Sequence, residues 1–546
     1  MEKRTFKVVL KLGLYFVLLL ALVGCQTTPS APAEIKLTEE NTFRFMLPDA
    51  PLELDPSASN ESFSAPIVDH AFEPLVTLDK KGIVQPAGAA KWSVSEDGMT
   101  YTFNLREGAK WSDGKLIVAS DYRKTWLRIM SPTLKLATSN LMAPYILNGI
   151  KYSRGEVNAS EVGVSAPDDK TLIVKLQSPT TFFLQLVSYI VYAPIRTDIV
   201  EKNGEEWDQL SSNYISNGPY KVQSYEKGKS IVLVKNTFYW NYKAIKIPAI
   251  EMLIKQKDQD PFELYKSGQV DGLYQVLVSD LRTISDLDSQ IYINQAISTA
   301  FISVNHNNPL FTQETFREAL STTIDRQSIV DEILLGGGIA SRYLVPSSML
   351  LSGENFHEFT KLNPPNDEKK SQKAFNAVDF SKIDKSKPIR VYYMSSRTDG
   401  PIMEAITQKW HATFGLNFEL KGMEWPELYQ ACRDGNYDIA LVGFGGDYPH
   451  PMTFLSMFLD GGFGENVTKW SDIDFQNKIL QSLSIQDQKE SLLKLRELEA
   501  KIIDENHIFP LYHRKVICLM NDRVKGWYRD GMLHFNFKEA SLDPKQ

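Results

Sequence analysis

The first third of the chain alternates apolar and polar residues in short runs that are separated by turn residues. Residues 99–105 place Met, Tyr, Phe and Leu at every second position, which is the period of a half-buried β-strand. Asp97-Gly98 separates this run from 92–94, and an Asp-Gly pair between two such runs predicts a hairpin. The turn-forming residues 167–170 precede the apolar run 172–176 and predict a second hairpin.

In the second half of the chain, apolar residues recur three and four positions apart. This spacing predicts amphipathic helices within 316–320, 329–334 and 492–502. Between them, the apolar runs 389–393 and 438–442 predict strands. Because strands that alternate with helices indicate an α/β domain, the whole chain is predicted to be of mixed α/β class.

Three local features refine these elements. Ser120 stands where the N-cap of a helix over the following residues is expected, and Gly336 suits the end of the 329–334 helix. The stretch 367–370 is rich in acids and bases and follows Asn363-Pro364-Pro365, which predicts an exposed loop.

The N-terminus carries a different pattern. Basic residues precede the apolar stretch 12–23, which is shorter than the roughly 20 residues that cross a membrane and has the form of a signal-peptide core. Its end, Leu22-Val23-Gly24-Cys25, resembles the lipobox of bacterial lipoproteins. The resemblance implies a signal peptide over 1–24, Cys25 diacylated, as by palmitate chains, and inserted in a lipid bilayer, and a polar tether over 25–41. The alternative is an ordinary signal peptide with a chance cysteine.

Composition places the chain among globular proteins. Apolar residues make up 43% of its 546 residues and charged residues 23%, which excludes collagen-like, low-complexity and disordered classes. The formal charge is −7 and becomes −10 once the leader, with four basic residues and one acid, is removed. This mild acidity gives no reason to expect a nucleic-acid partner. Cys432 and Cys518 would then remain, either as a disulfide or as two separate buried thiols.

No motif in the chain predicts catalysis. There is no G-x-S-x-G nucleophile elbow and no G-x-x-x-x-G-K-[ST] phosphate loop. The eight His residues are dispersed, with His507 and His513 the nearest pair, and no pair has the i, i+4 spacing of a helical zinc site. The sequence therefore predicts a protein that is not an enzyme and uses no cofactor or metal.

One segment has features of a binding site. Residues 441–450 place a strand end, three glycines, Asp447 and aromatic residues together. Glycine lets another backbone approach closely, and an aspartate beside such a gap can pair with an ammonium group. The alternative is a strand that runs into a glycine turn with a solvated Asp447.

Several segments resemble one family, the extracellular solute-binding proteins of peptide and nickel ABC importers, and particularly oligopeptide-binding proteins. The most specific match runs from Ala90-Lys91-Trp92 through Ser95-Glu96-Asp97-Gly98 to Ala109-Lys110-Trp111-Ser112-Asp113-Gly114. Supporting matches follow in the family's order, at 216–220, 236–240, 268–271, 316–320 and 324–326. They span essentially the whole mature chain.

The resemblance implies a periplasmic-binding-protein-like fold of three interleaved lobes, with a two-crossover hinge and a ligand cleft between lobes. The implied boundaries are 42–78, 181–297 and 511–546 for lobe I, 79–180 for lobe II and 298–510 for lobe III. Peptide held in the cleft would pair its backbone with strand edges.

The resemblance also implies the residues around the ligand. Asp447 occupies the place of the aspartate that accepts the peptide α-ammonium in relatives. The other implied positions are Gly443, Phe444 and Gly445 along the peptide backbone, Trp425 at a side-chain pocket, Asn60, Glu61 and Ser62 on the facing segment, and Tyr512 and Arg514 near the returning crossover.

The chain departs from relatives where the peptide carboxylate is held. Some relatives have basic residues at the positions of Leu441 and Asp399, and a cysteine at the position of Gly445, so that neither feature carries over. Arg397 or Arg514 is a candidate substitute for the basic residues, and ordinary surface charge is the alternative role of each.

The sequence thus predicts a monomeric lipoprotein of the cell envelope, in the periplasmic space or on the outer surface of the cytoplasmic membrane. It would capture oligopeptides, such as cell-wall peptides, and deliver them to an ABC permease. The alternatives are a binding protein for a metal chelate, haem or another small molecule, and a surface adhesin or chaperone.

Overall fold

The computed structural model describes residues 35–59, 62–204, 206–209, 211–278, 280, 290–351, 354–357, 366–381, 383, 387–395, 398–459, 466–529, 532 and 534–544. The predicted signal peptide and Cys25 lie outside these residues. The chain divides into two compact units, Met1–Leu37 and Thr38–Gln546, and the second holds all the elements below. No helix within the described residues is long and apolar enough to cross a membrane.

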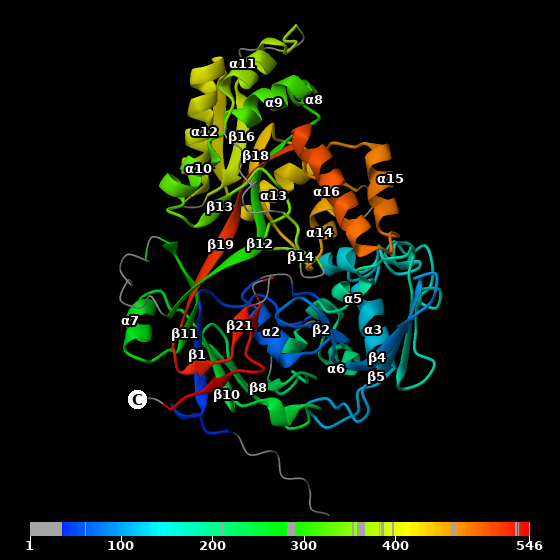
Figure 1. The fold of residues 1–546 in the computed structure, drawn as a ribbon. Coiled ribbons are helices and arrows are strands. Elements are labelled where there is room, and N and C mark those ends of the chain that lie inside the picture. Colours follow the sequence, from blue (N-terminus) through cyan, green and yellow to red (C-terminus); the bar gives the residue numbers. More distant parts are fainter. Residues whose placement is uncertain are drawn as a thin grey trace, which may run out of the picture. The chain divides into compact units, whose positions relative to one another are not determined.

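A large mixed sheet forms the frame of the Thr38–Gln546 unit (Figure 1). β1 pairs in parallel with β10 and β11, β16 pairs in parallel with β17 and β18, and the other neighbours are antiparallel. In spatial order the strands are β17 (Phe418–Met423), β16 (Ile389–Met394), β18 (Ile439–Gly445), β12 (Ile291–Val304), β19 (Ile508–Met520), β11 (Gly272–Val276), β1 (Thr42–Leu47), β10 (Ala249–Ile254), β9 (Ser230–Lys235) and β8 (Tyr220–Glu226), with β13 (Gly338–Ala340) beside β19.

Two long strands join the halves of this sheet. β12 and β19 pair along their length, and only one end of the pair meets β11 while the other meets β18. Their register shifts between Gln295 and Thr299 and again between Ala300 and Phe301. Such bulges bend a strand, so the strand pair changes direction between the two halves. The predicted crossovers at 297–298 and 510–511 fall within these strands, and the division into three lobes stays a prediction.

A second sheet confirms the two predicted hairpins. β4 (Ala89–Val94) pairs with β5 (Thr100–Leu105), and Gly98 makes the turn with φ +70°. β7 (Thr171–Lys175) pairs with β5 and with β6 (Val164–Ser165). Short strand pairs complete the sheet structure: β2 (Val76–Leu78) with β3 (Val84–Pro86), β14 (Leu350–Leu351) with β15 (Glu354–Asn355), β20 (Val524–Lys525) with β23 (Ser541–Leu542), and β21 (Tyr528–Arg529) with β22 (Phe535–Asn536).

Helices surround both sheets. They are α2 (Ala65–Ala71), α3 (Ala119–Ile129), α4 (Gly149–Ser153), α5 (Phe183–Leu186), α6 (Thr197–Asn203), α7 (Pro261–Lys266), α8 (Pro309–Thr312), α9 (Glu314–Thr322), α10 (Arg326–Ser328), α11 (Glu368–Asn376), α12 (Asp399–Phe414), α13 (Trp425–Asp434), α14 (Met452–Leu455), α15 (Ile473–Ser482) and α16 (Gln488–Asp504). The mixed α/β class predicted from the sequence is confirmed.

Two local predictions were wrong and one was incomplete. Ser120 is not the N-cap of α3, because Val118 holds that position and the Asp121 carboxylate accepts a hydrogen bond from the Val118 N–H at 3.0 Å. Asp367 begins α11 as its N-cap rather than lying in a loop. The 329–334 helix continues α10 as a π-helical turn over Ile329–Ile333, before Gly336 at φ +89°.

Four apolar cores lie within the described part of the unit. The largest joins the β4–β7 sheet and α3 to α14, α15 and α16. The others lie under β1 and β8–β10, around β16 and β18, and beneath α7. Cys432 and Cys518 are free and buried, so of the two alternatives the structure has separate thiols and no disulfide between them. Burial raises the pKa of the Cys432 thiol to about 12 and that of the Cys518 thiol to about 11.

Candidate functional site

A cavity of about 630 Å³ lies where β18 ends beside β12 and β19. We call it the cleft cavity. Segments far apart in the sequence line it, from Ser59 before α2 to His534. Five residues predicted from the sequence are among its lining: Ser62, Gly445, Asp447, Tyr512 and Arg514.

Asp447 is held by its backbone while its carboxylate faces the cleft cavity. Its N–H donates to Thr453 Oγ1 at 2.9 Å, and the N–H of Gly446 donates to Ile297 O at 2.8 Å. A Cβ on Gly446 would lie 2.8 Å from Ile297 Cγ2, so this tight approach needs glycine. Within the described part of the chain, no hydrogen bond or ion pair reaches the Asp447 side chain. Burial raises the pKa of Asp447 to about 6.

An aromatic cluster fixes the segment that carries Asp447. Tyr448 OH and Tyr145 OH lie 3.0 Å apart, and the Phe182 ring stacks on His450 with centroids 4.2 Å apart. Burial lowers the pKa of His450 to about 3, so the ring is neutral in this cluster. Tyr145 and Phe182 therefore hold Tyr448 and His450, which follow Asp447 in the chain.

Arg514 brings a positive charge to the same cavity. Ala300 of β12 lies between Gly443 and Tyr512 in the sheet register, and the Arg514 guanidinium reaches across β12 onto Gly443. A Cβ on Gly443 would stand 2.6 Å from Arg514 Nη2, so the absence of a side chain there makes room for the guanidinium. Arg514 is exposed, and it forms no hydrogen bond or ion pair with another described residue.

Residues that were not predicted complete the wall. Tyr274 of β11 donates its OH to the Ser62 carbonyl at 3.0 Å and so positions that segment. His534 Nδ1 lies 3.1 Å from Asp69 Oδ2. The Arg529 guanidinium lies 4.2 Å from the centroid of the Phe535 ring. Their separation along the chain leaves no motif that could have identified them; the aromatic richness of 527–537 is the only signal.

Six other predicted residues lie elsewhere or outside the described residues. Gly443 does not line the cavity, and Phe444 packs its ring 5.3 Å from that of Phe454. Trp425 begins α13, is 47% exposed and pairs with the Tyr429 ring at 5.6 Å, away from the cavity lining. Asn60 lies outside the described residues, as do Glu61 and Arg397.

Asp399 and Leu441, the two positions where some relatives are expected to have basic residues, lie in different environments. Asp399, the first residue of α12, lines the cleft cavity. Leu441 is 2% exposed and belongs to the core around β16 and β18. An apolar side chain therefore stands where some relatives are expected to hold a basic residue.

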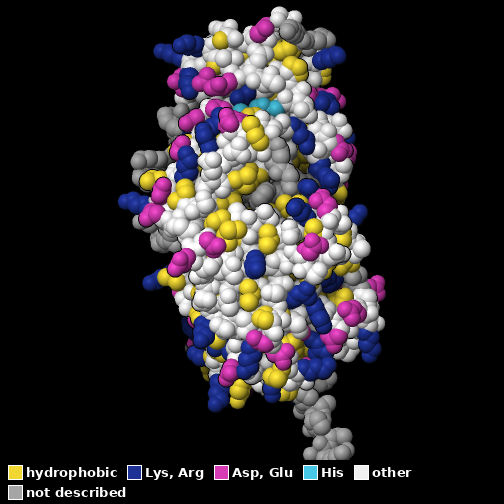
Figure 2. Space-filling view, turned by 90° about the vertical axis from the view of Figure 1, so that its right-hand side faces the viewer, with side chains coloured by type: hydrophobic (Ala, Val, Ile, Leu, Met, Phe, Trp, Pro, Cys, Tyr) yellow, Lys and Arg dark blue, Asp and Glu magenta, His cyan; other side chains and the backbone are white. Residues whose placement is uncertain are grey.

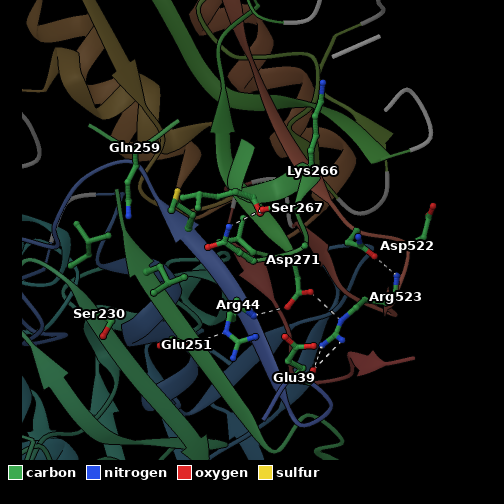
Figure 3. A pocket seen from close by; sticks show the side chains of 18 of the residues that line it. Glu39, Arg44, Ser230, Glu251, Gln259, Lys266, Ser267, Asp271, Asp522 and Arg523 are labelled. Carbon is green, nitrogen blue, oxygen red and sulfur yellow. Dashed lines mark hydrogen bonds and ion pairs between the residues drawn. The ribbon is translucent and has the colours of Figure 1, made fainter. Parts of the chain in front are cut away.

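A larger hollow, about 1380 Å³, is lined by side chains of β1 and β10, of the segment before β11 and of residues 521–525 (Figure 3). We call it the outer hollow. Arg44 Nε lies 3.1 Å from Glu251 Oε2, and Arg523 Nε lies 3.1 Å from Asp271 Oδ1. The Arg44 N–H also donates to Asp271 Oδ2 at 2.8 Å. These contacts tie β1, β10, β11 and the C-terminal segment together. Among the residues described, no group of three or more His, Cys, Asp or Glu side chains could hold a metal ion.

Comparisons with known proteins identify the relatives of this architecture. Residues 84–466 match the sequence model of the bacterial extracellular solute-binding proteins, family 5. The dipeptide-binding protein DppE of Bacillus subtilis strain 168 is 29% identical over 546 residues, 98% of this chain and 99% of the relative. The oligopeptide-binding protein OppA of the same organism is 27% identical over 538 residues, 97% and 98% of the two chains.

A solved structure has the same fold. Listeria monocytogenes OppA bound to peptide is 27% identical and superposes with a TM-score of 0.76 over 93% of this chain and 100% of that one. The predicted periplasmic-binding-protein-like fold is thereby confirmed.

Proposed function

This chain belongs to the bacterial extracellular solute-binding proteins of family 5, and on that basis we propose that it captures oligopeptides and delivers them to the permease of an ABC importer. The observation that carries the proposal is the Asp447 carboxylate, which is half-buried beside the cleft cavity and meets no donor among the described residues. A peptide α-ammonium supplies the counter-charge and hydrogen bonds that this carboxylate otherwise lacks.

Arg514 is proposed to hold the other end of the peptide. Its guanidinium offers a planar set of donors that matches a carboxylate. Gly445 lies between these charges along β18, and a Cβ placed on it would meet no atom nearer than Ile297 O at 4.0 Å. Open space at this strand end suits a ligand backbone that approaches as an added strand. The relatives DppE and OppA are named as dipeptide-binding and oligopeptide-binding proteins, which agrees with such a ligand.

Delivery is proposed to follow closure about β12 and β19. We propose that contacts such as that between the Tyr145 and Tyr448 hydroxyls, 3.0 Å apart, form on closure. A permease that selects the closed form would then receive only loaded protein. Acylated Cys25 would keep the protein in the cell envelope, beside the permease, without limiting its rotation on the tether.

The test compares the unaltered protein with Asp447→Asn. Native mass spectrometry of protein purified without denaturation should release a series of peptides, and calorimetry with one of them should give an affinity about 100-fold weaker in the variant, since a buried ammonium loses its counter-charge. An N-acetylated copy of the same peptide is the matched ligand control and should bind both proteins weakly.

Two results would overturn the proposal. Unchanged affinity in Asp447→Asn would remove the assignment of Asp447. A single non-peptide mass released from the native protein would favour a small-molecule ligand, and fragments of the added peptide would indicate hydrolysis.

A further inference from the structure

Aromatic rings and basic side chains share one exposed area of the Thr38–Gln546 unit, formed by segments 106–116 and 235–246. Phe238, Trp240 and Tyr242 are 37%, 37% and 38% exposed. Each ring has a cation near its face, at 3.6 Å from the centroid for Arg106 over Trp240, 5.8 Å for Lys110 over Phe238 and 5.4 Å for Lys235 over Tyr242. We name the exposed parts of these two segments the aromatic–basic surface.

The charge of the aromatic–basic surface is positive. The two segments contain six Lys and Arg against two acids, Glu107 and Asp113. Both acids are paired with cations from outside the segments, Glu107 with Lys170 at 2.8 Å and Asp113 with Arg196 at 2.6 Å. Arg196 is shared with Asp198, also at 2.6 Å. The whole chain carries a formal charge of −7, so this local surplus runs against the overall sign. Figure 2 shows many Lys and Arg side chains along the lower end of the unit, mixed with hydrophobic and acidic ones.

The chain enters the unit beside the aromatic–basic surface. Thr42, the first residue of β1, pairs with Ala249, and Ala249 pairs with Val234. Segment 235–246 connects the end of β9 to the approach to β10, so it lies at the same sheet end, toward the bottom of Figure 1. Glu39 and Glu40 precede β1 there and reduce the positive surplus.

We propose that the aromatic–basic surface rests on an anionic phospholipid bilayer. Tryptophan and tyrosine rings favour the headgroup layer. The Trp240 N–H already donates to Glu73 Oε2 at 2.7 Å, so the exposed part of this ring offers apolar area. Lysine and arginine beside them are attracted by anionic headgroups. Leu116, 59% exposed at the Asp113-Gly114 turn, adds apolar area next to the rings. Contact at the end where the chain enters would hold the unit in one orientation on the membrane, which a polar tether alone does not do.

The test uses residues 38–546, which contain all four apolar cores and so are expected to fold without the N-terminal segment and without any acyl chain. Flotation is measured with vesicles of equal parts phosphatidylglycerol and phosphatidylcholine, and with phosphatidylcholine alone, at low and high salt. Binding is expected on the anionic vesicles at low salt.

Charge-reversal variants locate the contact. In the triple variant Lys110→Glu, Lys115→Glu, Lys243→Glu, the vesicle partition coefficient is expected to fall at least about 100-fold. Each basic residue near an anionic surface contributes about fivefold to this coefficient. The matched control is Lys369→Glu, Lys373→Glu, Lys489→Glu, which makes the same charge change on exposed helix residues elsewhere and should lose less than about threefold by net charge alone.

Leu116→Ser provides a second readout that leaves charge unchanged. It is expected to weaken partition about fivefold, because a half-exposed leucine contributes roughly half of its full transfer free energy. The proposal is overturned if the unaltered unit does not float with anionic vesicles, or if the two triple variants lose binding equally. Normal peptide affinity in each variant separates a surface effect from misfolding.

Discussion

The cleft cavity and the outer hollow differ in how their charges are used. The outer hollow has the larger volume, about 1380 Å³ against about 630 Å³. Its principal charged side chains are paired with one another, as Arg44 is with Glu251 and Arg523 with Asp271. In the cleft cavity, Asp447 and Arg514 form no ion pair with any other residue that the structure describes.

If the cleft cavity is the binding site, as proposed above, volume alone does not mark it. A buried charge without a partner costs free energy, which a ligand of opposite charge recovers. A pair that is already complete offers a ligand little and mainly stabilises the fold. If the cleft cavity binds ligand and the outer hollow stabilises the fold, substitutions in the two hollows should change different properties.

The largest expected effect is on folding, from the outer hollow. Asp271→Asn leaves the buried Arg523 guanidinium without its carboxylate, their side chains being 3% and 6% exposed, and should lower the free energy of unfolding by about 3 kcal/mol. Urea unfolding measures this. Peptide affinity of the folded fraction should stay the same. Asp447→Asn is the matched substitution and should leave ligand-free stability equal or higher; a loss of peptide affinity in Asp271→Asn would contradict the division.

The second effect is a pH dependence that originates at Asp447. Its pKa in the folded protein is about 6, above the ordinary 3.8, so the folded state holds this proton more tightly than the unfolded state. Stability of the ligand-free protein should therefore fall as pH rises from about 4 to about 6, by up to about 3 kcal/mol. Thermal unfolding across this range measures it, and Asp447→Asn should remove that part of the slope.

The same proton links pH to binding. A peptide ammonium favours the charged carboxylate, so peptide affinity should decrease below about pH 6 and binding at that pH should release about half a proton. Calorimetry in buffers of different ionisation enthalpy measures the release. Equal proton release by Asp447→Asn would assign it to another group.

Gly443→Ala tests the position of Arg514 with a smaller effect. The new methyl group would stand 2.6 Å from Arg514 Nη2 and displace the guanidinium, so peptides with a free carboxylate should bind about 10-fold more weakly. C-terminally amidated peptides should change little. In an Arg514→Gln background the same substitution should have almost no further effect, because the group that it displaces is gone. An undiminished effect there would show that Gly443 acts on the ligand by another route.

The smallest expected effect comes from the aromatic cluster that holds the segment after Asp447. Tyr145→Phe removes the hydroxyl 3.0 Å from Tyr448 OH and should cost the closed form about 1 kcal/mol, or about fivefold in affinity, mainly through faster release. Stopped-flow dissociation measures this rate. Tyr101→Phe is the control, because its OH donates to Thr180 O at 3.3 Å within the predicted lobe II; it should leave release unchanged.

Local chemistry explains which elements could be predicted. The 92–105 hairpin needs only an Asp-Gly turn and alternating residues, which are adjacent in sequence. The N-cap of α3 was predicted at Ser120 rather than Val118 because the Asp121 side chain accepts a hydrogen bond from the Val118 N–H. The polar stretch 367–370 was predicted as a loop, although Asp367 is the N-cap of a helix. Both errors arise where one side chain's hydrogen bond selects among similar polar residues.

The sequence by itself determined the fold class, the family resemblance and the candidacy of Asp447, because each depends on residue types at short spacings. Only the tertiary structure decided which charges remain available. Gly443 and Arg514 meet because β12 lies between their strands, and Asp271 and Arg523 pair because β11 lies beside β19. Pairing between residues distant in the chain is set by strand order and register, which no local pattern encodes.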